Sequence, residues 1–193
     1  SKNYFKNKSF VTYFLLILTL SSTLYYHQNY VSNRRFMDLE KVDLNKAIDG
    51  QNLNEMFKNI KWINIFYPEN PKDEIIQLKS AIKIIKDDNR KKIIVTDYQF
   101  ISVLLSIYDF SPTRFWYQHH GYPSIENKYF ENWKVFFTNK LKENQTEVVY
   151  MIKPLHGESN PLQNILSDDC LIKEKPSDIV DVFVIDNCSE INN

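Results

Sequence analysis

An uncharged stretch near the N-terminus restricts the fold more than any other feature of this sequence. Phe10 to Tyr26, FVTYFLLILTLSSTLYY, contains no charged residue. A helix of this length spans roughly 25 Å, which is the short end of what crosses a bilayer. Tyr25, Tyr26 and Tyr30 would form an aromatic belt at its far end. We therefore predict a transmembrane helix, with the lipid bilayer as a partner.

Two other interpretations of this stretch remain. A signal peptide fits the lysines before the apolar core, but no small-x-small cleavage site follows. A buried helix of a soluble protein fits less well, because every face is apolar. Lys2, Lys6 and Lys8 flank the near end, whereas Arg34 and Arg35 lie farther off on the other side. The positive-inside rule then puts residue 1 in the cytoplasm and the main domain on the extracytoplasmic side. We predict that the membrane is the cell inner membrane.

The rest of the chain alternates short apolar runs with helical patterns. We predict a transmembrane helix and its flanks over residues 1–31 and an extracytoplasmic α/β domain over 32–193. The apolar run Ile93 to Thr96 is typical of a strand buried on both faces, as in parallel sheets. We expect an open, mostly parallel sheet flanked by helices. Its predicted strands are 62–66, 93–96, 147–152 and 179–185, its helices are 53–60, 71–87, 98–108 and 129–142, and residues 156–175 are predicted to form a loop.

The carboxyl end of the strand at 93–96 is the first candidate binding position. Ligands of open α/β sheets bind outside the carboxyl ends of the strands, here at Asp97, Tyr98 and Gln99. An acid at this point can accept hydrogen bonds from a ligand. The alternative is that Asp97 only caps the helix that follows it.

One irregular loop holds the second set of candidates, because it combines aromatic rings with Arg and His. Such residues bind flat, polar ligands such as sugars by stacking and by hydrogen bonds. The alternative is a loop held over the sheet by buried aromatic side chains. Adjacent histidines point different ways in most backbones, so we predict no metal site. The candidates are Arg114, Trp116, His119 and His120, in a loop that continues to Tyr122.

Composition excludes several kinds of site. The formal net charge of the 193 residues is zero, so we predict no nucleic-acid partner. Glycine occurs only 3 times, and neither a GxGxxG motif nor a phosphate-binding loop is present. We therefore predict no nucleotide site and no cofactor.

The two cysteines, Cys170 and Cys188, lie on either side of the last apolar run. A disulfide between them is expected if the domain lies outside the cytoplasm. Two buried free thiols are the alternative.

Several segments together resemble a known family. The apolar helix is followed, in order, by IKWINIFYPENPKDEI, IIVTDYQF, SPTRFW and NKYFENWKVFF. This series, covering most of Phe10 to Leu155, resembles the C-terminal part of polytopic bacterial membrane proteins. Those proteins are similar to glycosyltransferases of the GT-C superfamily, in the dolichyl-phosphate-mannose mannosyltransferase-like group. The shared segments are structural rather than catalytic.

The resemblance implies that further membrane helices precede this chain. It also implies a polyprenyl-phosphate sugar as donor and a catalytic acid in an early extracytoplasmic loop, so we predict no catalytic residue here. We expect the C-terminal extracytoplasmic domain of a glycosyltransferase-like protein of envelope glycan assembly, which positions a glycan acceptor or braces the membrane part. The first alternative is a singly anchored periplasmic binding or interaction module. The second is a soluble enzyme, which requires a deep polar pocket at Asp97 and a cleaved N-terminus.

Overall fold

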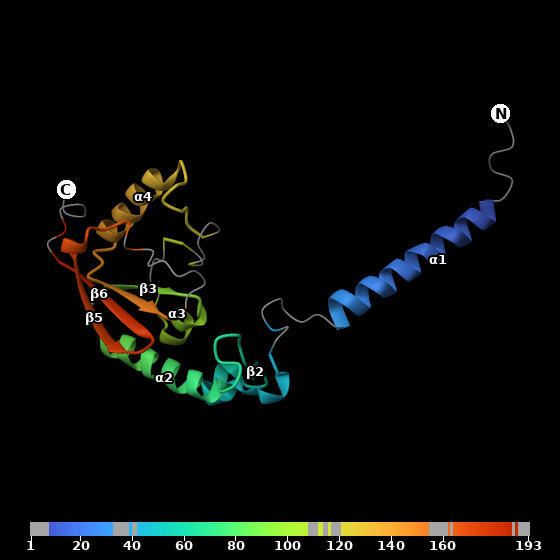
Figure 1. Cartoon of the computed structure of the whole chain (residues 1–193), viewed down its shortest axis with the longest axis horizontal. Coiled ribbons are helices and arrows are strands. Elements are labelled where there is room, and N and C mark those ends of the chain that lie inside the picture. The colour runs from blue at the N-terminus through green and yellow to red at the C-terminus, as the bar shows by residue number, and fades with distance from the viewer. Residues whose placement is uncertain are drawn as a thin grey trace.

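A computed structural model gives the conformation of the chain and describes residues 8–32, 39, 42–107, 112, 113, 116, 121–154, 162, 164–186 and 188. Helix α1 (Lys8–His27) continues into a π-helical turn, Gln28–Ser32. Its described side chains are all exposed, and it extends away from the sheet (Figure 1). The predicted helix is confirmed, and it is not a core helix. Its mean hydropathy, 1.4 over Ser9–Val31, is consistent with a membrane anchor or a signal sequence.

The main sheet has four strands in the order β3-β4-β6-β5. They are β3 (Lys92–Thr96), β4 (Val148–Ile152), β5 (Leu171–Ser177) and β6 (Val180–Ile185). Only β3 and β4 pair in parallel, whereas β6 is antiparallel to both of its neighbours. The predicted mixed α/β class is confirmed, but the prediction of a mostly parallel sheet is wrong.

The error arises at β5, which lies largely within the predicted loop at 156–175. Its sequence, LIKEKPS, exposes every residue from 172 to 176 and includes a proline. Charged residues and proline are typical of edge strands, and here they hide the alternation that marks a strand. A two-residue turn joins β5 to β6 and makes the pair antiparallel.

Helices cover both faces of the sheet, and Figure 1 shows α2 (Pro71–Asp87) and α4 (Phe130–Glu143) on opposite sides of it. Helix α2 begins with proline at its first turn, followed by Asp73 and Glu74 at the positive end of the helix dipole. The helices predicted at 71–87 and 129–142 are therefore confirmed.

Alternation along the strands divides the core into two layers. Ile93 and Val95 point to the face of α4, and Ile94 points to the face of α2. The layer on the α4 side includes Trp116, Tyr122, Phe137, Leu141, Val149, Met151, Phe183 and the two cysteines. The layer on the α2 side includes Ile75, Leu78, Ala81, Ile85, Ile101, Val148, Tyr150, Ile152, Val180 and Val182.

The predicted helix at 98–108 is much shorter in the structure. Helix α3 spans Phe100–Leu105, and it ends at Ser106, whose φ of 52° is left-handed. A left-handed residue closes the last helical turn. Ile101 is the one fully buried residue of α3, whereas Val103 is exposed, so this helix packs on the sheet with one side only.

The segment before α2 also differs from the prediction. Strand β2 is limited to Lys61–Trp62 and pairs with β1 (Ile48–Asp49), outside the main sheet. The side chain of Asn64 accepts hydrogen bonds from the backbone N–H groups of Phe66 and Tyr67, which turns the chain away. The strand predicted at 62–66 is therefore wrong. The helix predicted at 53–60 is reduced to one 3₁₀ turn, Glu55–Phe57, preceded by two others at Leu44–Lys46 and Gly50–Asn52.

Candidate functional site

The carboxyl ends of β3 and β4 meet at one edge of the sheet. The register pairs Thr96 with Ile152, so Asp97 and Lys153 leave the two strands side by side. Asp97 is half-buried, and it is not the N-cap of α3, which is Gln99. The hydroxyl of Thr96 instead accepts the hydrogen bond from the Tyr98 N–H. Asp97 thus takes the predicted position at the sheet edge without the capping role.

A buried carboxylate lies one strand farther across the same edge. Asp181, on β6, pairs with Met151, and its side chain is 4% exposed. The ammonium nitrogen of Lys153 lies 2.7 Å from its Oδ2, and that of Lys173 lies 3.8 Å away. A buried charge needs such partners, since leaving it unpaired is costly. Lys153 therefore forms an ion pair with Asp181, and it follows β4 at the level at which Asp97 follows β3.

We call Asp97, Lys153 and Asp181 the carboxyl-edge cluster. Its carboxylates accept hydrogen bonds and its ammonium group donates them, a combination that suits the hydroxyl groups of a sugar. Lys153 and Asp181 are not among the residues predicted from the sequence. Both could have been predicted from the sequence. Lys153 directly follows the apolar run of β4, as Asp97 follows that of β3, and Asp181 is a single acidic residue within the apolar run of β6.

Tyr98 points toward α2 and not toward a ligand crevice. Its hydroxyl donates to Glu74 over 2.7 Å, and burial, followed by this hydrogen bond, raises the pKa of the phenol. Glu74 is 1% exposed and also accepts from the indole N–H of Trp62 over 2.8 Å and from the amide of Asn64. One carboxylate therefore holds the segment before α2 and the end of β3 together.

We expect Glu74→Gln to lower the free energy of unfolding by about 1–3 kcal/mol. Glutamine keeps one acceptor oxygen but turns an amide group toward at least one of the three donors. Thermal unfolding in detergent micelles measures the loss. Glu131→Gln is the matched control, since Glu131 is also in the first turn of a helix but is exposed. Equal stability of both variants would contradict the role given to Glu74.

Of the remaining predicted residues, only Gln99 is described at this edge. It is exposed, and its backbone N–H donates to the Asp97 carbonyl over 3.0 Å. Trp116 is 3% exposed and packs between Tyr122 and Phe137, with both ring centroids 6.0 Å away. Its indole is thus a core side chain and not an exposed stacking surface. Arg114, His119 and His120 lie outside the described residues.

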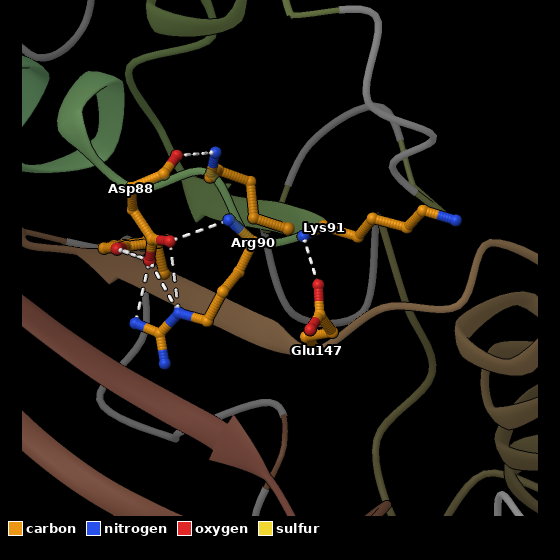
Figure 2. Close-up of polar contacts among 6 residues, drawn as sticks. Asp88, Arg90, Lys91 and Glu147 are labelled. Carbon is orange, nitrogen blue, oxygen red and sulfur yellow. Dashed lines mark hydrogen bonds and ion pairs between the residues drawn. The ribbon is translucent and has the colours of Figure 1, made fainter.

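A second polar cluster lies at the opposite edge, where β3 and β4 begin (Figure 2). The Asp88 carboxylate accepts from the Arg90 guanidinium, with Nη2 at 2.8 Å, and from the Tyr150 hydroxyl. Burial opposes ionisation of Asp88, but these hydrogen bonds outweigh it and lower its pKa to about 2. Burial and the bond to Asp88 raise the pKa of Tyr150 to about 12. Beside it, the Lys91 N–H donates to Glu147 over 2.8 Å.

This second cluster joins the end of α2 to the sheet, and it makes a prediction about acid stability. The pKa of Asp88 is about 2 in the folded protein against an ordinary 3.8. Its contribution to stability is therefore complete above about pH 4 and is lost as the pH falls toward about 2. We expect the parent's free energy of unfolding to fall more steeply over this range than that of Asp88→Asn. Urea unfolding at several acidic pH values measures both slopes.

The control for the acid experiment is Asp178→Asn, because the Asp178 side chain is 96% exposed. This variant should keep the parent's slope. If Asp88→Asn also keeps it, the cluster does not hold the Asp88 charge in the folded state.

One pocket lies apart from both clusters. It has a volume of about 180 Å³ and is lined by Ser102, Val103, Ser106 and Ile107, on and after α3. It is small for a ligand site and does not include Asp97. Within the described ranges, no group of three or more His, Cys, Asp or Glu residues could hold a metal ion.

Cys170 and Cys188 form a disulfide, with their Cα atoms 4.7 Å apart. It closes the segment that contains β5 and β6 and packs in the core layer on the α4 side. No model of a known protein family matches this chain, and neither a curated protein nor a solved structure is found to match it.

Proposed function

We propose that α1 anchors this chain in a membrane. The observation that carries the proposal is a 20-residue apolar helix with none of its described side chains buried against the rest of the chain. Water solvates such a surface poorly, whereas the hydrocarbon core of a bilayer solvates it well. The backbone of a helix is satisfied internally, so it enters lipid at little cost.

Carbonate extraction of membranes from expressing cells tests this anchoring. We expect the full chain to stay in the membrane fraction. Release of a shortened, soluble product would show that α1 acts as a signal peptide.

The proposed side of the membrane is extracytoplasmic, at the inner membrane. The disulfide supports this side, because disulfides persist in oxidising compartments and are rare in the cytosol. The lysines that precede α1 agree with it under the positive-inside rule.

We further propose that the domain serves a glycosyltransferase-like membrane protein of envelope glycan assembly, whose donor is a polyprenyl-phosphate sugar. The sequence resemblance supports this role, and the carboxyl-edge cluster offers groups that would hold the hydroxyls of a glycan acceptor. Catalysis would lie in membrane-proximal loops outside this chain. The domain would position the acceptor or brace the membrane helices.

Binding of envelope glycan fragments to the chain in detergent tests the acceptor role. We expect Asp97→Asn to weaken binding by about 1–2 kcal/mol, roughly tenfold, because a charged acceptor is lost while the shape is kept. Asp87→Asn, at an exposed position at the end of α2, near the opposite edge of the sheet, should bind like the parent. Unchanged binding by Asp97→Asn would leave only the bracing role.

A second candidate function is a singly anchored periplasmic binding or interaction module. The outer face of α4 favours it, because Val135 and Phe136 are exposed there, as is Tyr129 just before the helix. Such exposed apolar side chains are typical of contact surfaces. The reading frame upstream distinguishes the two functions: further hydrophobic segments in frame support the glycosyltransferase-like protein, and a start codon just before Ser1 supports the module.

A further inference from the structure

The segment between α1 and α2 has apolar side chains on two sides. Toward the domain, Leu53 is buried, and the ring of Phe57 packs edge-on against those of Trp62 and Phe100 at 5.7 and 5.1 Å. These contacts account for how the segment is held to α3. A second set of aliphatic side chains in the same segment is not buried.

This second set points to solvent. Leu44, Met56 and Ile60 are 47%, 63% and 50% exposed. Met56 and Ile60 belong to one tight turn, in which the Ile60 N–H donates to the Phe57 carbonyl. The Ile60 carbonyl in turn accepts from the Gly50 N–H over 2.7 Å, so the turn is tied to the preceding one. A short, hydrogen-bonded turn therefore carries two exposed aliphatic side chains.

The position of this turn in the chain determines what it can reach. Residue 32 ends the π-helical turn after α1, and Val42 begins the described range 42–107. Ten residues span at most about 33–36 Å when fully extended. If α1 crosses a bilayer, as proposed above, Val42 is confined within that distance of the membrane surface. The turn follows it in the same folded segment, so it is held at a high effective concentration near the membrane.

We propose that Leu44, Met56 and Ile60 insert into the interfacial layer of the same bilayer that α1 crosses, so that the domain rests on the membrane by this segment. The inference rests on the proposed anchoring. Lys58 and Lys61 flank Ile60, and Glu55 precedes Met56, so charges of both signs surround the aliphatic side chains. Binding therefore depends on apolar burial and does not require anionic lipid.

The test uses the full chain in phosphatidylcholine vesicles. Both native cysteines are in the disulfide, so Met56→Cys or Ile60→Cys supplies a single thiol for an environment-sensitive fluorophore. Ile172→Cys is the matched control, because Ile172 is 52% exposed on β5. We expect labels at 56 and 60 to emit at shorter wavelength than the label at 172. Lipids with a nitroxide near the headgroup should quench them several-fold more.

Flotation of the same labelled samples separates the two proposals. If the protein floats with the vesicles but labels at 56 and 60 behave like the label at 172, anchoring stands and the contact with lipid is overturned. If the protein does not float, both are overturned. A shift to shorter wavelength that nitroxide lipids do not quench, and that disappears at low protein-to-lipid ratio, would show contact with a second copy and would also overturn the lipid contact.

Discussion

Replacing Trp116 with alanine is expected to lower the free energy of unfolding by about 3–5 kcal/mol, the usual cost of truncating a buried aromatic side chain. Trp116 is 3% exposed in the core layer on the α4 side, between Tyr122 and Phe137. Removing the indole leaves a cavity that these neighbours fill only in part. Thermal or urea unfolding in detergent micelles measures the change.

Two variants make this experiment specific. Tyr129→Ala removes an aromatic ring that is 58% exposed and should change stability by no more than about 0.5 kcal/mol. Trp116→Phe keeps most of the packing and should lose less than the alanine variant. If Trp116→Ala instead weakens glycan binding while stability is unchanged, the indole acts at a surface and the core assignment is wrong.

Removal of the disulfide is expected to have the second large effect. The free energy of unfolding of the Cys170→Ser, Cys188→Ser double variant should be about 3 kcal/mol lower, because the bridge joins two residues 18 positions apart and restricts the unfolded chain. The bridge also holds the last residues of the described chain against β5. Urea unfolding of parent and variant measures the difference.

The same bridge tests the side of the membrane. Alkylation of intact cells followed by denaturation should leave both cysteines unlabelled unless a reductant is added. The parent treated with reductant should then match the double variant in stability. Free thiols in the untreated native protein would contradict an oxidising compartment and, with it, the extracytoplasmic side.

Local sequence patterns were sufficient to predict those helices whose positions follow from the residues within the helix itself. The uncharged stretch of α1 and the apolar face of α2 can be recognised from a few helical turns of sequence. Proline in the first turn of α2 marks where that helix begins. The boundaries of α4 follow from its aromatic periodicity in the same way. Strands β3, β4 and β6 were predicted as well, because each is a short apolar run buried on both faces.

The direction of the strands was not contained in those patterns. An apolar run looks the same in a parallel and an antiparallel sheet, so only the connection through β5 made β6 antiparallel to β4. The short length of α3 likewise depended on Ser106, which has a left-handed backbone conformation. A glycine at that position would have indicated the end of the helix in the sequence, but a serine does not.

The sequence by itself determined a helix that is long and apolar enough to cross a membrane, followed by an α/β domain. It also indicated Asp97 as a candidate binding residue. These features follow from local hydrophobicity and from the order of the strands. Only the tertiary structure decided which polar groups meet. It paired Asp181 with Lys153, Tyr98 with Glu74 and Asp88 with Tyr150, and it placed Trp116 in the core. Each partner comes from a different element, and burial compels a polar group to find a partner without specifying in the sequence which one.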